Sequence, residues 1–360
     1  MTRIYLDHAA TTPLRPEARE AMLRGFDLWA NPSSPHADGR KARAALEDAR
    51  ERVKAALNWS QGELIFTSGA SEAAAIALGR AKGGRRMVSA VEHDSVLRTA
   101  PDATVLPVGP DGALDLEVLD RELKGADRPV VAVQIINSET GNQQDFCEIA
   151  DRVDEVGGIS IIDASQAAGK YRFRYYSSMV IVSAHKFGGP IGIGALLVHD
   201  YGLLEPTGGH ERGYRRGTEN LPGALAMAAA LEAGGEPYIP WGPHELMEQF
   251  GAEVRAVGGT WFDDRIDVPT GFIYAIAMPG LSGKAQLMRF DLQGISVSQG
   301  SACSSGSLHS SHVLKAMGVP DEEAERTIRV SLGWNTTRED VERFCESWLK
   351  MAREGAERAA

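Results

Sequence analysis

Short apolar runs alternate with amphipathic helical runs through the first two-thirds of the chain, and this alternation constrains the fold more than any other feature. We expect strands in the apolar runs at residues 63–67, 130–137, 159–162, 179–182 and 195–198. Helical patterns begin at Glu72, directly after Ser68–Ser71, and cover Asp145–Val156. Short apolar strands separated by helices predict βαβ units and an α/β fold with a mainly parallel sheet covered on both faces.

Polar residues gather where these apolar runs end. In open parallel sheets, ligands bind beyond the carboxyl ends of the strands. The residues expected at those ends are Asn137, Asp163, Gln166, Ser183, His185 and Lys186. The sequence therefore predicts a binding site along this edge of the sheet.

Composition and charge exclude several classes of protein. The 360 residues, 43% hydrophobic and 24% charged, are ordinary for a globular chain of two or three domains. A net charge of −11 argues against nucleic acid or anionic membrane as the main partner. The three cysteines are too few for a disulfide framework and favour a reducing compartment. With Asp7 and His8 where a signal peptide needs an apolar core, and no run of roughly 18 apolar residues, we expect a cytoplasmic protein.

The composition changes after about residue 235. Gly234, Gly235 and the prolines that follow interrupt the helical pattern of residues 221–232. A final helix is predicted by an apolar face made of Val341, Phe344, Cys345, Trp348, Leu349 and Ala352. Between them, residues 298–311 hold seven serines and two glycines around Cys303, which predicts a surface loop.

The stretch from Ser183 to Pro190 carries the clearest chemical signal. Lys186 directly follows an apolar strand and precedes a glycine-rich turn, where a lysine can form a Schiff base with an aldehyde cofactor. A buried lysine–carboxylate pair is the structural alternative. Asp163 could pair with a protonated pyridine nitrogen, and Gln166 could donate to the ring's phenolic oxygen. Together these residues favour pyridoxal phosphate.

The junction from Ser68 to Ser71 could hold the phosphate of such a cofactor. A glycine turn at the start of a helix presents free backbone N–H groups to an anion, and Ser71 adds a hydroxyl. By itself, the junction favours the plainer interpretation of a serine N-cap followed by Glu72.

Motifs spread over the chain resemble those of one known family. They are YLDHAATTP (5–13), FTSGASE (66–72), EH (92–93), DASQ (163–166), SAHK (183–186), GGHERG (208–213), RGTEN (216–220) and GSAC (300–303). In this order, from about residue 4 to residue 340, the chain resembles the group I cysteine desulfurases of the class V aminotransferase family. The resemblance implies a fold type I pyridoxal-phosphate enzyme, with a large domain at 13–235 built on a seven-stranded-type sheet. It also implies a smaller α/β domain, made of 1–12 and 236–360, that carries the cysteine loop at about 298–311.

The resemblance also implies a role for each matching residue. Lys186 would bind pyridoxal 5′-phosphate covalently, Asp163 would pair with the ring nitrogen, and His93 would stack on the ring and assist proton transfer. The remaining cofactor contacts would be Ala70, Ser71, Gln166, Ser183, His185 and, from the partner subunit of a homodimer, Thr218. Asn137 and Arg329 would bind the substrate carboxylate, although Ser138 stands where the family more often has a second asparagine.

Cys303 would be the sulfur acceptor, because a thiolate on a loop can reach the substrate and then carry sulfur to a partner. Cys345 lies on an apolar helix face and Cys147 in a helical run without polar neighbours. His309 and His312 have too few further ligands to suggest a metal site, so no metal is expected.

The expected reaction is conversion of L-cysteine to L-alanine, with sulfur passing to Cys303 as a persulfide and then to an acceptor protein. That acceptor could be an iron–sulfur scaffold or a thiolation protein. A selenocysteine lyase or another class V enzyme is the alternative, and an inactive scaffold of the same fold is a remote one.

Overall fold

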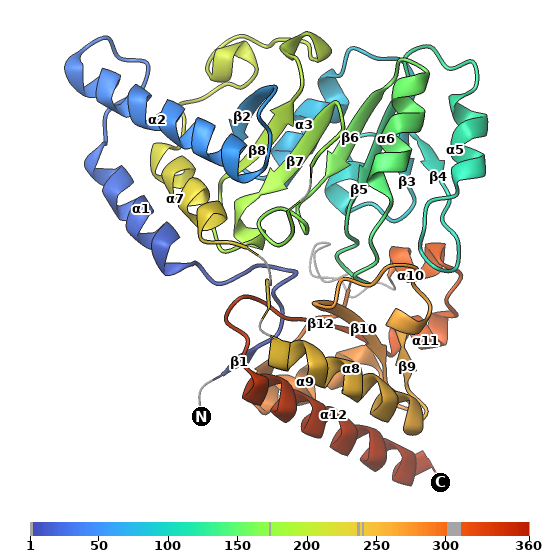
Figure 1. Cartoon of the computed structure of the whole chain (residues 1–360). Helices are drawn as coiled ribbons and strands as arrows, with labels where there is room; N and C mark the ends of the chain where they lie inside the picture. Colours follow the sequence, from blue (N-terminus) through green and yellow to red (C-terminus); the bar gives the residue numbers. More distant parts are fainter. Residues whose placement is uncertain (1–2, 173, 236–237, 240, 301–310, 360) are drawn as a thin grey trace.

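A seven-stranded sheet forms the larger part of the molecule (Figure 1). The computed structural model describes residues 3–172, 174–235, 238–239, 241–300 and 311–359. The strand order is β2-β8-β7-β6-β5-β3-β4. The strands are β2 (Glu63–Thr67), β3 (Arg86–Ser89), β4 (Thr104–Leu106), β5 (Val130–Gln134), β6 (Ile159–Asp163), β7 (Met179–Ser183) and β8 (Gly194–Val198).

The prediction of a mainly parallel sheet is confirmed, with one exception. Strands β4, β3, β5, β6 and β7 run parallel to one another, whereas β8 is antiparallel to both β7 and β2. Strand β5 also ends earlier than expected, at Gln134. Beyond it, the Asn137 amide donates to the Asn142 carbonyl at 2.8 Å, so the chain turns back at the edge of the sheet.

Helices cover both faces of this sheet. On one face, α3 (Ala70–Arg80) packs its alanines against Ile65, Ile181 and Leu196. The other face is covered by α2 (Ala37–Ala56) and α7 (Leu221–Glu232), and farther along by α5 (Leu116–Leu123) and α6 (Phe146–Glu155). Helix α1 (Pro16–Asp27) packs on α7 at the outer edge, and α4 (Asp94–Leu97) is a single turn after β3. A buried core on both faces fixes the strand ends that carry the polar residues.

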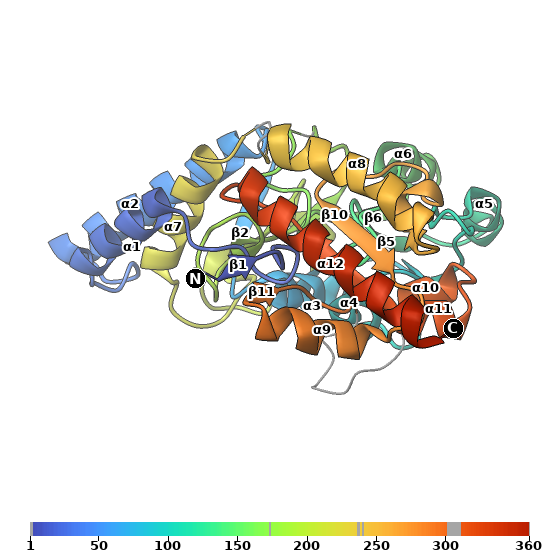
Figure 2. The ribbon, with the colours of Figure 1, turned by 90° about the horizontal axis from the view of Figure 1, so that it is seen from below.

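The smaller part has an antiparallel sheet of order β12-β10-β9, formed by β9 (Thr260–Trp261), β10 (Ile273–Ala277) and β12 (Thr327–Ser331). Its helices are α8 (Trp241–Ala256), α9 (Gly283–Leu292), α10 (His312–Ala316), α11 (Asp321–Glu325) and α12 (Arg338–Ala359). Figure 2 shows α12 running across the underside between α8 and α9. Val341, Phe344 and Trp348 are fully buried there, as the helical pattern predicted. The division at residue 235 stays a prediction.

The N-terminal segment links the two parts. Strand β1 (Ile4–Tyr5) pairs in parallel with β11 (Ile295–Ser296), and the Leu6 carbonyl accepts from the Ser331 amide at 2.8 Å. A few residues later, the Thr12 amide donates to the His185 carbonyl at 2.7 Å. Residues 9–12 therefore lie along the carboxyl edge of the large sheet, where the Ala9 and Ala10 carbonyls also accept hydrogen bonds.

The short 3₁₀ helices are η1 (Ala184–Lys186), η2 (Tyr201–Leu203), η3 (Glu211–Gly213) and η4 (Phe262–Asp264). Within the described ranges, none of the helices has the length and apolar character needed to cross a membrane.

Candidate active site

A cavity of about 430 Å³ opens at the carboxyl edge of the large sheet. Eight residues expected at the site line it together: Ala70, Ser71, His93, Asp163, Gln166, Ser183, His185 and Lys186. They come from the ends of β2, β3, β6 and β7 or from the turns that follow, which is where a parallel sheet collects its ligands.

Lys186 presents its amine to this cavity from η1, directly after β7. Its Nζ donates to the carbonyl oxygens of Ala9 and Ala10, at 2.7 and 2.9 Å. Both acceptors belong to the N-terminal segment. These backbone carbonyls therefore hold the lysine at the cavity edge.

Asp163 is the last residue of β6 and Gln166 lies in the turn after it, and both line the cavity and are largely buried. Oδ1 of Asp163 accepts from the Ser165 amide at 2.8 Å. Nε2 of Gln166 donates to the Ala9 carbonyl at 2.8 Å. The floor thus offers a carboxylate and an amide donor beside the Lys186 amine.

The N-terminus of α3 forms another wall. Gly69 takes a φ of 152°, a conformation that favours glycine, and allows the chain to turn sharply from β2 into the helix. The Ser68 amide donates to Glu72, which also accepts from Nε of Arg215 at 2.9 Å. Burial raises the pKa of Glu72, but these hydrogen bonds outweigh it and lower the pKa. The first N–H groups of α3 and the Ser71 hydroxyl remain at the cavity, where they suit an anion such as phosphate.

The two histidines that line the cavity are neutral at neutral pH. Burial lowers the pKa of His93, although the Asp163 carboxylate opposes this effect. Burial and the charge of Lys186 lower the pKa of His185 to about 4. The Ser95 amide donates to Nδ1 of His93 at 3.1 Å, so the proton of the neutral ring lies on Nε2.

A third histidine, His8, lies beside the cavity in the N-terminal segment and is 1% exposed. Burial, together with the charge of Lys170, lowers its pKa to about 3. Because only the unfolded chain takes up this proton, folding stability is retained above the unfolded pKa of about 6.5 and lost as the pH falls toward 3. When the pH is lowered from 7.5 to 5.0, this histidine alone should lower the free energy of unfolding by about 2 kcal/mol.

We therefore expect the free energy of unfolding of His8→Gln to fall by about 2 kcal/mol less than that of the natural protein over the same pH range. The measurement is denaturant unfolding of both cofactor-free proteins at the two pH values. His36→Gln, at an N-cap away from this cavity, is the control and should keep the steeper dependence. If the free energy of unfolding changed equally with pH in His8→Gln and in the natural protein, His8 would not be the source of this pH dependence.

Arg329 lies in a smaller cleft that adjoins the cavity and shares His93, Ser138 and Lys186 with it. Its guanidinium is 3% exposed and pairs with Asp7 at 2.7 Å. Nη1 donates to the Ser138 carbonyl at 2.9 Å, while Nε has no hydrogen-bond partner among the residues that the structure describes. The planar fork is thus fixed at the cavity margin by its two terminal nitrogens.

The structure places Asn137 differently from expectation. Its Oδ1 accepts from the Glu139 and Thr140 amides, and Nδ2 donates to the Val91 carbonyl. These bonds hold the amide in the turn after β5, outside the cavity lining, whereas Ser138 faces both the cavity and the cleft. The sequence did not predict that Ser138 lines the cavity, because the direction in which a side chain points after a strand depends on the conformation of the turn.

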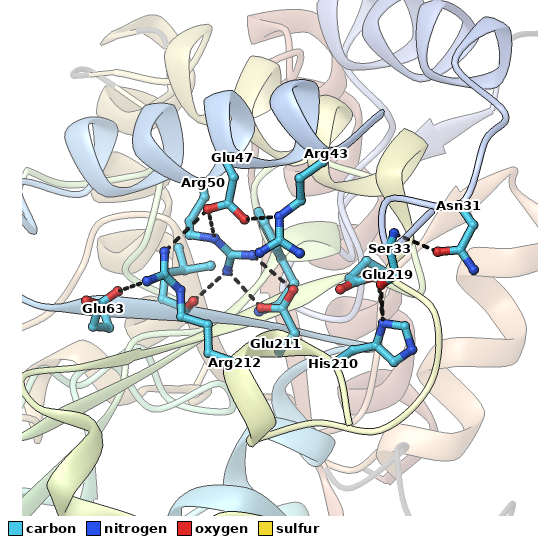
Figure 3. A network of polar contacts seen from close by, with 12 residues as sticks. Asn31, Ser33, Arg43, Glu47, Arg50, Glu63, His210, Glu211, Arg212 and Glu219 are labelled. Carbon is cyan, nitrogen blue, oxygen red and sulfur yellow. Dashed lines mark hydrogen bonds and ion pairs between the residues drawn. The ribbon is translucent and has the colours of Figure 1, made fainter. Parts of the chain in front are cut away.

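Thr218 is exposed on the loop of residues 208–220, outside the cavity formed by this chain. Figure 3 shows how this loop is held: Arg50 of α2 forms a buried ion pair with Glu211, at 2.7 Å. Glu211 and Arg212 have positive φ values of 47° and 56°, and His210 pairs with Glu219 at 3.1 Å across the loop. The ion pairs thus maintain a strained backbone that presents Thr218 outward.

The predicted nucleophile, Cys303, lies outside the described residues. Gly300 and His312, described on either side of it, both line the cleft that contains Arg329. The other cysteines, Cys147 and Cys345, are free thiols, and burial raises the pKa of each. Among the described residues, no group of three or more His, Cys, Asp or Glu side chains could hold a metal ion.

The carbonyls of Ala9 and Ala10 are the other site groups missed from the sequence. The only sequence signal for them was the motif at residues 5–13, which contributed to the family resemblance but did not predict a function for its backbone atoms. Every residue has a backbone carbonyl, so the residue type does not reveal which carbonyls accept hydrogen bonds at a site. Only the three-dimensional structure places these two beside Lys186.

Known proteins resemble the whole chain. A protein named cysteine desulfurase IscS from Dictyoglomus turgidum is 34% identical, over 94% of this chain and 91% of that protein. The crystal structure of a NifS-like protein from Rickettsia africae has a TM-score of 0.87 and 29% identity, covering 97% and 99% of the two chains. A structure described as SspA in complex with cysteine has a TM-score of 0.79 and 27% identity, covering 93% and 100%.

The model of the family described as Aminotransferase class-V matches residues 4–344. This match includes both parts of the fold and every described wall of the cavity. The chain therefore belongs to the class-V aminotransferase family.

Proposed function

We propose that this protein is a pyridoxal-phosphate-dependent cysteine desulfurase that converts L-cysteine to L-alanine and transfers the sulfur to Cys303. One observation carries the proposal: the Lys186 amine, the Asp163 carboxylate and the N-terminus of α3 surround a single cavity. The cleft beside that cavity is bordered by Gly300 and His312, which flank the cysteine-bearing segment. Relatives named cysteine desulfurase support the substrate.

The residues of the cavity fit pyridoxal phosphate. Lys186 would hold it covalently, Asp163 would pair with its ring nitrogen, and Gln166 would donate to its ring oxygen. The phosphate would lie at the first turn of α3, near Ser71 and Ser183. When bound, this cofactor supplies an electron sink that stabilises negative charge at the substrate's α-carbon.

The chain's own groups would then carry out the remaining steps. Arg329 would bind the substrate carboxylate, with Ser138, rather than Asn137, lining the cavity beside it. His93 would hold a proton at Nε2 near the reacting carbon. The Cys303 thiolate would attack the substrate sulfur. As the S–S bond forms, the substrate C–S bond breaks, its electron pair stays with carbon, and alanine leaves after protonation.

The test is alanine formation from L-cysteine in the presence of a reducing thiol, with Cys303→Ser compared against the natural protein. Alanine from the natural protein alone supports the proposal, and Cys147→Ser is the control that should keep full activity. If Cys303→Ser formed alanine and transferred sulfur at the normal rate, the nucleophile assignment would be wrong.

Two alternatives have distinct outcomes in this assay. A selenocysteine lyase would release alanine from selenocysteine but not from cysteine. An inactive scaffold would purify colourless and would not take up pyridoxal phosphate. The acceptor would be an iron–sulfur scaffold or a thiolation protein, and a cytoplasmic location stays a prediction.

A homodimer is part of this proposal. Large apolar side chains are exposed on and just after α1: Leu23 is 51%, Phe26 56% and Trp29 80% exposed. Ile191, at the cavity wall, is 77% exposed. Because Thr218 is exposed and does not line the cavity of its own chain, a second copy could use that threonine to complete the phosphate site.

We expect Trp29→Glu to shift the protein from dimer to monomer and to weaken binding of pyridoxal phosphate, because a charge cannot be buried in an apolar interface without a partner. Light scattering measures the mass, and equilibrium dialysis measures the affinity. Leu292→Glu is the matched control, because Leu292 is 86% exposed on α9. A dimer of unchanged affinity in Trp29→Glu would place the interface elsewhere.

A further inference from the structure

A buried lysine, Lys170, lies behind the cavity floor and has no role in the proposed chemistry. It is 1% exposed and stands four residues after Gln166, in the turn that follows β6. The preceding Gly169 has a φ of 71°, and a Cβ there would lie 2.7 Å from Cβ of Phe187. The turn is therefore pressed closely against the chain that carries Lys186.

The Lys170 amine has one hydrogen-bond acceptor and two aromatic neighbours. Nζ donates to Oε1 of Gln166 at 2.7 Å. It also lies 5.3 and 4.9 Å from the ring centroids of Tyr238 and Phe272. Burial, with the charges of Lys186 and Arg329, lowers its pKa well below the usual range. The neutral amine and the ammonium can both donate to Gln166.

The hydrogen bonds of Gln166 fix the orientation of its amide. A glutamine amide can rotate by 180° and exchange its donor and acceptor ends. Here the Ala9 carbonyl, which can only accept, takes one hydrogen of Nε2, while Lys170 donates to Oε1. Because Gln166 lines the cavity, the second Nε2 hydrogen remains for an oxygen atom of a ligand.

We propose that Lys170 is a positioning residue: by donating to Oε1 of Gln166, it keeps the amide N–H directed at an oxygen of the ligand in the cavity. Under the proposed function, on which this identification rests, that oxygen is the phenolic oxygen of pyridoxal phosphate. A lysine with only a packing role would fill the space beside Tyr238 and Phe272 without affecting the ligand.

The variant that separates these roles is Lys170→Met. Methionine has a similar length and packs well against aromatic rings, but it cannot donate to Gln166. We expect the pH midpoint of the bound cofactor's absorbance change to rise by about half to one unit, because losing a donor destabilises the deprotonated oxygen. The dissociation constant of pyridoxal phosphate should rise roughly fivefold to tenfold.

Two comparisons make the test specific. Tyr171→Phe removes a neighbouring 2.6 Å hydrogen bond to the Thr270 carbonyl but leaves Gln166 untouched, so it should keep the natural midpoint. In a Gln166→Leu background, Lys170→Met should cause no further shift, because its effect passes through that amide. An unchanged midpoint and affinity in Lys170→Met, or equal shifts in both backgrounds, would overturn the proposal.

A measurement on the cofactor-free protein separates this inference from the proposed function. The side-chain amide signal of Gln166, identified by its loss in Gln166→Leu, should move in the NMR spectrum of Lys170→Met but not in that of Tyr171→Phe. If the natural protein failed to bind pyridoxal phosphate, the cofactor assignment would fail, while this signal would still decide the role of Lys170. An unmoved signal would rule that role out.

Discussion

Replacing Lys186 with alanine should abolish cysteine desulfuration, lowering kcat/KM by on the order of 10⁴-fold or more. This amine is the one primary amine among the described residues that line the cavity. Without it, the cofactor can be held only by non-covalent contacts to the α3 N-terminus, Asp163 and their neighbours. The protein should still fold, since the change is confined to the cavity edge, where Lys186 donates to the Ala9 and Ala10 carbonyls.

Mass spectrometry after borohydride reduction measures this covalent attachment directly. The natural protein should carry a cofactor adduct on the peptide that contains Lys186, and Lys186→Ala should carry none. Lys284→Ala is the control, because Lys284 is exposed at the start of α9, away from the cavity. An adduct in Lys186→Ala, or retained turnover, would mean that another residue anchors the cofactor.

Replacing Arg50 with methionine should lower the free energy of unfolding by about 3–5 kcal/mol. Arg50 donates to both carboxylate oxygens of Glu211 and to the Leu64 carbonyl, and its side chain is 2% exposed. Burial lowers the pKa of Arg50, but the hydrogen bonds and charge of Glu211 raise it above its usual range. Without Arg50, a buried carboxylate would keep only the Phe66 amide as a strong donor.

A double variant and a surface control make this prediction specific. Arg50→Met combined with Glu211→Gln should recover part of the loss, because no charge then remains buried. Arg52→Met removes a similar bidentate ion pair with Glu232. Because the Arg52 side chain is 33% exposed, the free energy of unfolding should fall by less than about 1 kcal/mol. Equal losses for Arg50→Met and Arg52→Met in denaturant unfolding would contradict this account.

The central sheet could be predicted from the sequence because buried strands between helices leave short apolar runs. The runs that end near Asp163 and Ser183 are both strands of this sheet, as expected, and they lie next to each other. The antiparallel direction of β8 could not be predicted, because a strand buried on both faces is apolar throughout, whichever way it runs. The β1–β11 pairing was also missed, since it joins two-residue strands distant in the sequence.

Those parts of the site could be predicted in which the type of side chain itself indicates a chemical role. Lys186, Asp163 and His93 have side chains suited to cofactor chemistry, and the structure brings all three to one cavity. Asn137 and Ser138 show the limit of this reasoning. Both are polar and adjacent, and only the turn after β5 decides that the asparagine bonds to backbone while the serine faces the cavity.

The position of the N-terminal segment has a consequence for biosynthesis. Ribosomes make residues 4–12 well before residues 294–331, yet the partners of this segment include the Gly294 and Ser296 carbonyls and Ser331. The large sheet can form while the chain is still growing, whereas the Ala9 and Ala10 carbonyls that bind Lys186 can be fixed in place only after residue 331 has been made. Loading of the cofactor is thus expected to follow synthesis of residue 331, and nascent chains stalled before residue 294 should fold the sheet but should not hold the Ala9 and Ala10 carbonyls beside Lys186.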